Sequence, residues 1–257
     1  MELKTAAEAG QYAFFLDIDG TLYNHGIICR KNRTAIREAR QAGHLVFINT
    51  ARSYGIIPEK VKKLKTDGVI SSIGCSIIVH GERQICAAFE EGPLWQTLSA
   101  LQQAGYPVVL ECEEGALYSP LYEKEAALTV SSPGDLHRHM ERTNIAKAYI
   151  PGTVDEKTAG WLTEQYMFFQ HGNYAEFAVL GHTKATGIAA VLKMFDIPPA
   201  RSVAMGDSMN DADMLRACGI SVAMGDGHPQ IKAMSTVVTG PAALGGVAEG
   251  IYRVLAK

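Results

Sequence analysis

Two aspartates stand one residue apart in the stretch AFFLDIDGTLYN, at Asp17 and Asp19. The apolar residues before them predict a buried strand, because a short apolar run ended by turn residues is typical of a strand covered on both faces. Two carboxylates held this close repel each other unless a cation lies between them or one is protonated. The pair therefore indicates a metal or acid–base site, although an Asp followed by Gly20 can also simply form a turn.

Three further groups of polar side chains lie where a predicted strand ends or a predicted helix begins. They are Thr50, Lys184, and the group Asp207, Asn210 and Asp211. In an open parallel sheet, ligands bind at the carboxyl ends of the strands. We therefore expect these groups and the first pair of aspartates to meet at one edge of a sheet, although they are far apart in sequence.

The residue types of this set suit the transfer of a phosphoryl group. The strand-ending aspartates offer hard oxygen ligands, which favour Mg²⁺. The Thr50 hydroxyl and the Lys184 ammonium could hold phosphate oxygens, and a helix opening at Asn210 would add backbone N–H groups. One carboxylate attacking phosphorus would give an aspartyl-phosphate. A second carboxylate could protonate the leaving oxygen and then deprotonate the attacking water.

Strands that alternate with helices surround these residues in the first and last thirds of the chain. Strands are predicted at 13–18, 44–49, 69–73, 201–207 and 220–226, and helices at 30–43, 54–68, 184–197, 209–219 and 244–257. Alternation of this kind is typical of a parallel sheet covered by helices on both faces. The predicted fold class is α/β, with a Rossmann-like parallel-sheet core.

The middle of the chain has a different pattern. Hairpin signals around His80-Gly81 and Gly172-Asn173 enclose two amphipathic helices. Residues 82–181 carry 14 Asp and Glu against 6 Lys and Arg, a net charge of −8, whereas the remainder carries 13 against 18, a net charge of +5. Two domains are therefore predicted: an α/β core of residues 1–81 and 182–257, and an inserted α+β domain of residues 82–181.

The composition limits the class of protein. The chain has 257 residues, 47% of them hydrophobic, and a net charge of −3, so it can bury a substantial core. No apolar stretch is long enough to cross a membrane, the N-terminus does not resemble a signal peptide, and no basic run suggests nucleic acid. The five cysteines form no CxxC pair and indicate reduced thiols. We expect a cytoplasmic protein, a monomer or weak homo-oligomer, whose partner is a small phosphorylated metabolite.

The motifs together resemble those of a known family. The segments DIDGTL, INTAR, Lys184 and GDSMND resemble, in this order, the four motifs of the haloacid dehalogenase-like phosphatase superfamily. The insertion between Thr50 and Lys184 is similar to the C2B cap of its Cof-type (IIB) branch. The resemblance extends to AMGDGHPQIK and covers nearly the whole chain. It implies a Rossmann-like core, Mg²⁺, and hydrolysis of small phosphate monoesters through an aspartyl-phosphate.

Motif matching also implies a role for individual residues. Asp17 would be the nucleophile and Asp19 the general acid and base. The residues that would bind phosphate or its surroundings are Thr50, Arg52, Lys184 and Asn210. The residues that would bind Mg²⁺ are Asp17, Asp19, Asp207 and Asp211.

Three positions depart from the family's pattern. Ala51 stands where the family usually has Gly, between Thr50 and Arg52. Ile73-Gly74-Cys75 stands where Asn-Gly-Ala is common, and Gly225-Asp226-Gly227 where Gly-Asn-Ala is frequent. The last two lie on loops near the predicted site. They therefore leave open which residues contact the substrate, but they do not change the predicted chemistry.

Two other functions are open on the sequence alone. A phosphosugar mutase of the phosphomannomutase type would need cap arginines for a second phosphate, and the inserted region has only Arg83, Arg138 and Arg142. A phospho-receiver module would have no insertion of this length and no second carboxylate after the acceptor. Sugar phosphates, pyridoxal phosphate and flavin mononucleotide all fit as substrates, with Asn173 and Glu176 as candidate substrate contacts.

Overall fold

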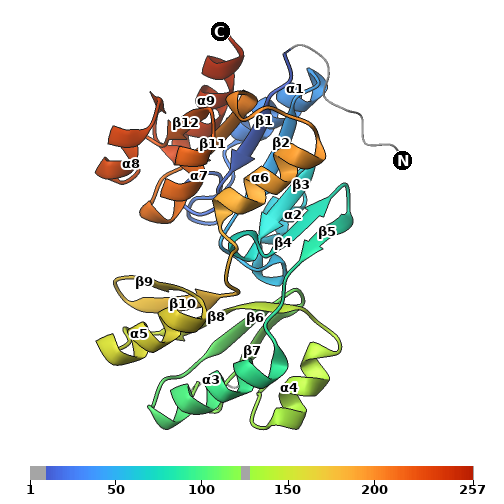
Figure 1. Ribbon diagram of the computed structural model, residues 1–257. Helices are drawn as coiled ribbons and strands as arrows, with labels where there is room; N and C mark the ends of the chain where they lie inside the picture. Colours follow the sequence, from blue (N-terminus) through green and yellow to red (C-terminus); the bar gives the residue numbers. More distant parts are fainter. Residues whose placement is uncertain (1–9, 123–127, 257) are drawn as a thin grey trace. The chain divides into compact units, whose positions relative to one another are not determined.

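The computed structural model describes residues 10–122 and 128–256, which form two compact units (Figure 1). The core unit comprises the described parts of Met1–Ala51, Pro58–Gln84 and Thr183–Lys257. The inserted unit comprises Arg52–Ile57 and the described part of Ile85–His182. These bounds assign residues 52–57 to the inserted unit, whereas the predicted core included them.

The core unit is built on an eight-stranded sheet with the strand order β13-β12-β11-β1-β2-β3-β4-β5. Its strands are β1 (Ala13–Leu16), β2 (Leu45–Asn49), β3 (Gly68–Ser71), β4 (Ser76–Val79), β5 (Glu82–Cys86), β11 (Ser202–Gly206), β12 (Ile220–Ala223) and β13 (Val237–Val238). Every pair from β13 to β3 is parallel, and β4 pairs with β3 in the antiparallel sense. The predicted α/β core is confirmed.

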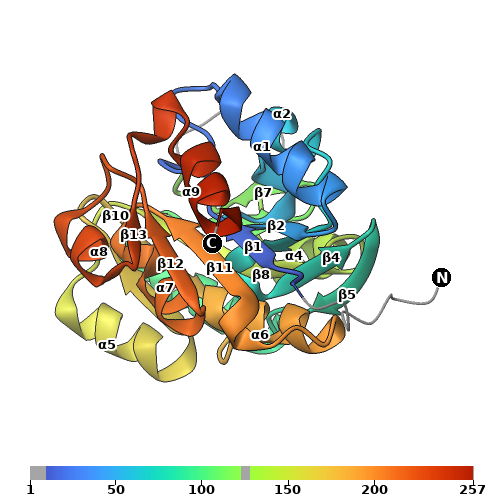
Figure 2. The same cartoon turned by 90° about the horizontal axis from the view of Figure 1, so that it is seen from above.

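Helices cover both faces of this sheet. They are α1 (Arg30–Gln41), α2 (Glu59–Lys62), α6 (Lys184–Met194), α7 (Ala212–Ala217), α8 (Pro229–Met234) and α9 (Gly246–Leu255). Figure 2 shows α1 and α9 on one face and α6 and α7 on the other. Helices α1 and α9 are joined by Asn32 of α1, whose buried Oδ1 accepts a hydrogen bond from the Ala248 N–H of α9 at 3.0 Å. The central strands are therefore buried on both sides, as their apolar sequence predicts.

The prediction of one continuous helix over residues 54–68 is wrong. The structure has a short 3₁₀ helix at Tyr54–Ile56 and a single turn of α-helix, α2, at Glu59–Lys62. Pro58 separates the two because it has no N–H to donate and forces the preceding residue out of the helical region. Ile57 accordingly has extended backbone angles, φ −67° and ψ 130°.

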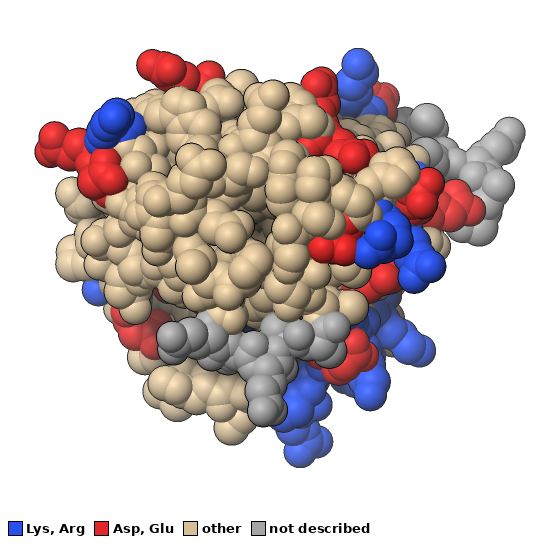
Figure 3. All heavy atoms as spheres, turned by 90° about the horizontal axis from the view of Figure 1, so that it is seen from below, with Lys and Arg blue, Asp and Glu red and all other residues tan. Residues whose placement is uncertain are grey.

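The inserted unit is an α+β structure with a five-stranded sheet of order β7-β6-β8-β10-β9, in which the recorded pairs are antiparallel. Its strands are β6 (Val109–Cys112), β7 (Gly115–Tyr118), β8 (Ile145–Pro151), β9 (Met167–Gln170) and β10 (Tyr174–Ala178), and its helices are α3 (Glu91–Gln103), α4 (Pro133–Met140) and α5 (Glu156–Gln165). Apolar side chains of the helices pack on one face of the sheet against Leu110, Ala148 and Phe177. In the view of Figure 3, charged side chains stand mainly at the margins.

Residues 52–57 form part of the inserted unit through close contacts with β6 and β7. The backbone N–H of Ser53 donates to Glu111 Oε2 at 3.3 Å. A Cβ atom at Gly55 would lie 2.3 Å from the Gly115 nitrogen and 2.5 Å from the Cys112 oxygen. Only glycine therefore allows the two backbones to come this close.

The opposite face of the same sheet carries a buried group of charges. Alternation along the strands places Glu111, Lys147 and Glu176 opposite the hydrophobic cluster, and each is at most 8% exposed. The Lys147 ammonium lies 2.5 Å from Glu176 and 3.5 Å from Glu111. Burial opposes its charge, but the two carboxylates outweigh burial and raise the pKa of Lys147. Burial would raise the pKa of Glu176, yet Lys147 and His171 lower it to about 2.

None of the helices within residues 10–122 and 128–256 is both long enough and apolar enough to span a membrane.

We predict that Lys147→Met destabilises the inserted unit by about 3–5 kcal/mol, because it leaves two buried carboxylates without their cation. Urea unfolding at pH 7 measures the effect. The matched control is Lys157→Met, which removes an exposed lysine of α5 and should change stability by less than about 0.5 kcal/mol. Equal effects of the two substitutions would show that the buried ion pairs contribute nothing.

Candidate active site

Three adjacent strands of the core sheet end in polar residues at the same edge. Asp17 follows β1, Thr50 follows β2 and Asp207 follows β11. Since β1 pairs in parallel with both neighbours, all three residues leave the sheet at its carboxyl edge. The backbone N–H of Asp17 donates to the Met205 oxygen at 3.0 Å and fixes the end of β1 against β11.

A buried lysine joins two carboxylates at this edge. Lys184, 1% exposed, donates from Nζ to Asp17 Oδ1 at 2.7 Å and to Asp211 Oδ1 at 2.6 Å. One carboxylate oxygen from each of Asp17, Asp207 and Asp211 lies within 4.8 Å of the others. Four of the residues predicted from strand ends and helix starts are therefore brought together here: Asp17, Lys184, Asp207 and Asp211.

Hydrogen bonds hold the other carboxylates in place. The Thr21 hydroxyl donates to Asp207 Oδ1 at 2.7 Å. Asp211 Oδ2 accepts from the backbone N–H groups of Asp207, at 2.9 Å, and Ser208, at 3.1 Å. The contact of Thr21 with Asp207 was not predicted, and the sequence signal for it is the place of Thr21 directly after the aspartate pair and Gly20.

Two glycines make room for the carboxylates. Gly20 has a φ of +78°, and a Cβ atom there would lie 2.4 Å from Asp207 Oδ2. A Cβ atom at Gly206 would lie 2.6 Å from the Asp211 carboxylate. Any larger residue at either position would displace a carboxylate of the cluster.

Helix α6 positions Lys184 as its first residue. The side chain of Thr183 accepts hydrogen bonds from the Ala185 and Thr186 N–H groups and caps the helix. The Asn49 amide at the end of β2 donates to the Lys184 carbonyl oxygen at 3.1 Å.

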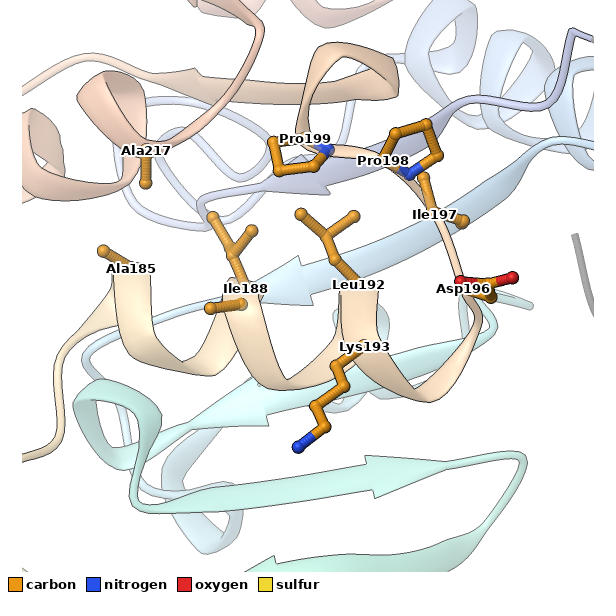
Figure 4. A pocket seen from close by; sticks show the side chains of 10 residues that line it. Ala185, Ile188, Leu192, Lys193, Asp196, Ile197, Pro198, Pro199 and Ala217 are labelled. Atoms are coloured by element: carbon orange, nitrogen blue, oxygen red, sulfur yellow. The ribbon is translucent and has the colours of Figure 1, made fainter.

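Apolar side chains anchor the rest of α6. Ile188, Val191, Leu192 and Phe195 are spaced so that they fall on one side of the helix, and all four are buried. Ile188 and Leu192 also line a hollow of about 480 Å³, on the side where Pro199 lies (Figure 4). The helix that carries Lys184 is thus fixed by packing along its length as well as by its cap.

The site holds more negative than positive charge. Burial raises the pKa of Asp17 to about 8, and the Asp211 charge adds to this effect against the opposing influence of Lys184. Burial also raises the pKa of Asp207 to about 6, despite the hydrogen bond from Thr21. Burial opposes the charge of Lys184, but Asp17 and Asp211 outweigh it and raise the pKa of this ammonium. Three carboxylates thus share one ammonium.

This donor set fits Mg²⁺. Its ligands are hard carboxylate oxygens, close enough together to bind one ion, and their excess negative charge is what a divalent cation would neutralise. Asp17, Asp207 and Asp211 are the residues that would hold it.

Asp19 and Asn210 stand at the exposed border of the site. The Asp19 carboxylate, predicted as a fourth metal ligand, is exposed and lies outside the group of three oxygens within 4.8 Å. Asn210 is also exposed, and its Oδ1 accepts from the Ser208 hydroxyl at 2.7 Å. Both side chains are therefore accessible to solvent.

The two remaining predicted residues belong to different units. Thr50 is buried in the core unit, and its backbone N–H donates to the Ile70 oxygen at 2.9 Å. Arg52 belongs to the inserted unit, where its guanidinium donates to the Ile56 oxygen at 3.2 Å. The predicted phosphate-binding set is thus divided between the units after Ala51.

The two loop departures have local structural consequences. Ile73 is buried with a φ of +58°, a conformation that β-branched residues rarely adopt and that Asn adopts more readily. Asp226 Oδ1 accepts from the Ala242 N–H at 2.9 Å, a bond that an Asn side chain could also accept. The departure at position 73 is therefore the one that strains the backbone.

Comparison with known proteins identifies similar chains. The family model described as haloacid dehalogenase-like hydrolase matches residues 14–251. YkrA of Bacillus subtilis, a proposed phosphatase, is 25% identical over 247 residues, 93% of this chain and 96% of that protein. The 5-amino-6-(5-phospho-D-ribitylamino)uracil phosphatase YcsE of Bacillus subtilis is 24% identical over 255 residues, 92% of each chain. The crystal structure of the subclass IIB sugar phosphatase BT4131 superposes with a TM-score of 0.78 at 23% identity, covering 95% of this chain and 99% of that one.

We predict that Mg²⁺ stabilises the protein more at pH 8 than at pH 5.5. The pKa values of Asp17 and Asp207 lie above the ordinary 3.8, so above about pH 4 the folded chain keeps protons that the unfolded chain releases. Without a cation, these two groups therefore lower the free energy of unfolding as the pH rises from about 4 to about 8. Mg²⁺ replaces those protons. At 100 times its dissociation constant it should add about 2.7 kcal/mol, or roughly 5–10 °C, at pH 8.

Thermal unfolding with Mg²⁺ and with EDTA at both pH values measures this effect. Asp207→Asn is the control and should lose most of the Mg²⁺ shift at pH 8. Shifts of equal size at the two pH values in the unsubstituted protein would contradict proton competition at the carboxylates.

Proposed function

The chain belongs to the haloacid dehalogenase-like hydrolase family. On this premise we propose that it is a Mg²⁺-dependent phosphatase of the Cof-type branch that works through an aspartyl-phosphate on Asp17. The relatives YkrA and YcsE are named as phosphatases, and the chain is accordingly a phosphoric monoester hydrolase that acts on small phosphate esters.

The proposal is supported above all by the hydrogen bonds of Lys184. A buried ammonium bonded to both Asp17 and Asp211, beside Asp207, is an arrangement that serves no simple packing purpose, because burying charges costs more than burying apolar side chains of the same size. It suits a site that must accept a phosphate dianion next to carboxylates.

Asp17 is the proposed nucleophile. Lys184 holds its Oδ1, so Oδ2 is the oxygen that attacks phosphorus. The new bond joins Asp17 Oδ2 to phosphorus as the bond from phosphorus to the leaving oxygen breaks. A Mg²⁺ ion held by Asp17, Asp207 and Asp211 would neutralise charge on the phosphate.

Asp19 is the proposed general acid and base. It gives its proton to the leaving oxygen in the first step and removes a proton from water in the second. The hydroxide then bonds to phosphorus, the bond to Asp17 breaks, and inorganic phosphate leaves. The exposed position of Asp19 is consistent with a residue that must be reached by the leaving group and by water. We assign phosphate contacts to Thr50, Arg52 and Asn210 as well.

We also infer the charge of the substrate. The inserted region 82–181 has a net charge of −8, which disfavours highly anionic substrates, although solvent screens exposed charges beyond about 8–10 Å. A neutral or zwitterionic monophosphate, such as a hexose phosphate or pyridoxal phosphate, is therefore preferred to a nucleoside triphosphate. A hydrolase of this kind releases inorganic phosphate without a bisphosphate activator, unlike a phosphosugar mutase.

Asp17→Asn should lower turnover by about 10³-fold or more on every substrate, because the amide cannot act as the nucleophile. Release of phosphate from p-nitrophenyl phosphate, hexose phosphates, pyridoxal phosphate and ATP measures this loss, and in the unsubstituted protein ATP should be the poorest substrate. Asp226→Asn is the control, since an Asn can keep the bond to the Ala242 N–H. Retained turnover in Asp17→Asn would refute the proposed nucleophile.

Asp19→Asn should impair alkyl phosphates more than aryl phosphates. An alkoxide needs a proton to leave, so loss of the acid should cost about 10²–10⁴-fold, whereas nitrophenolate leaves without one. The comparison of kcat for an alkyl phosphate and for p-nitrophenyl phosphate tests the role. An equal loss on both substrates would mean that Asp19 acts in some other way.

A further inference from the structure

A hollow of about 460 Å³ on the core unit is lined by positive charges. Three arginines come from α1 and two lysines from the turn after α2; they are Arg33, Arg37, Arg40, Lys63 and Lys65. The Arg40 guanidinium joins the two segments, because it donates to the Lys65 oxygen at 2.6 Å. The hollow has the volume of an ordinary small-molecule site.

Most of this charge has no carboxylate beside it. Asp67 forms two hydrogen bonds with Arg40, at 2.9 and 2.8 Å, and thereby neutralises that one cation. Among the described residues, no ion pair is recorded for Arg33, Arg37, Lys63 or Lys65. Four exposed cations therefore face one hollow without a counter-charge.

The same imbalance is present in the sequence of these segments. The only acidic residue of α1 is Glu38, and its carboxylate accepts a hydrogen bond from the Tyr252 hydroxyl at 2.7 Å. Arg33 and Arg37 are four residues apart, a spacing at which like charges on a helix repel each other. Such an arrangement is unfavourable in the unliganded protein, and a bound anion would relieve it.

The hollow lies away from the carboxylate cluster within the core unit. Asp67, which fixes Arg40, directly precedes β3, and its Oδ2 also accepts from the Val46 N–H near the start of β2. The hollow is therefore near the amino ends of the strands, whereas Asp17 and Asp207 follow their carboxyl ends. An anion bound here would not be a substrate bound for hydrolysis.

We propose that this basic hollow is a binding site for a small polyphosphate, a molecule with two or more linked phosphate groups. The guanidinium groups of Arg33 and Arg37 can each bind a phosphate through two parallel hydrogen bonds, and Lys63 and Lys65 supply point charges from the turn after α2. A single phosphate would engage only part of this set. The proposal does not depend on the hydrolytic function assigned above.

Calorimetric titration of the whole protein with inorganic tripolyphosphate tests the proposal. EDTA and low salt are used, because without a divalent cation the carboxylates of the catalytic site repel the probe. Arg33→Gln with Arg37→Gln should weaken binding by about tenfold or more, since both bidentate contacts are lost. Lys63→Gln with Lys65→Gln, in the turn after α2, should also weaken it.

The matched control is Arg30→Gln with Lys31→Gln. It removes the same charge from exposed positions of the same helix but outside the hollow, so binding should stay within about threefold. Turnover of p-nitrophenyl phosphate should be unchanged in all three double variants. Absence of binding to the unsubstituted protein, or an equal loss in the control, would overturn the proposal. Tighter binding of a single-stranded RNA with the same dependence on Arg33 and Arg37 would overturn the assigned class of ligand.

Discussion

The buried ammonium of Lys184 is the constraint on which the rest of the site depends. A lysine at the first position of a helix meets the positive end of the helix dipole, and its burial removes the water that would stabilise its charge. It is kept there by Asp17 and Asp211, which lie at the ends of different elements. Those elements must therefore keep their relative positions for the charge of Lys184 to stay compensated. The geometry of the site is thus tied to the stability of the core.

The same ammonium leaves the electrostatic balance of the site incomplete. Its single charge can balance one carboxylate of the three, and the Asp207 carboxylate accepts its hydrogen bond from the neutral Thr21 hydroxyl. A protein that needed only a stable core would not gather three acids where apolar side chains would pack as well. The remaining negative charge of the carboxylates would hold a divalent cation. The cation would in turn compensate the negative charge of a bound phosphate dianion.

The sequence predicted the parts of this arrangement that follow from strand ends. Asp17 and Asp207 come directly after apolar runs, and Lys184 begins a helix, so a parallel sheet brings them together without further information. The place of the Asp19 carboxylate outside the cluster could not be predicted, because it depends on the path of the turn after Gly20. Pro58 is a sequence signal for a helix break, but the helical spacing of the residues around it favoured one continuous helix, which the structure does not have.

Contacts between distant segments were beyond the reach of local patterns. Glu176 was predicted as a candidate substrate contact, but nothing near it in sequence indicates that Lys147 and Glu111 share its buried position. The basic hollow could likewise not be predicted from the arginines of α1 alone, because the lysines that complete it lie after α2. In both cases the residues are ordinary in their own segments, and only the strand order or the helix packing makes them neighbours.

The contribution of residues 52–57 to the inserted unit has a consequence for its modularity. The backbone of Ser53 satisfies Glu111, and Gly55 lies against β6 and β7, so the unit includes a piece of chain from between the second and third strands of the core. A polypeptide cut at residues 85 and 182 would lack that piece and would expose the backbone it covers. The inserted unit is therefore not a cassette that can be exchanged between related proteins at two junctions, because a transplant must carry residues 52–57 with it.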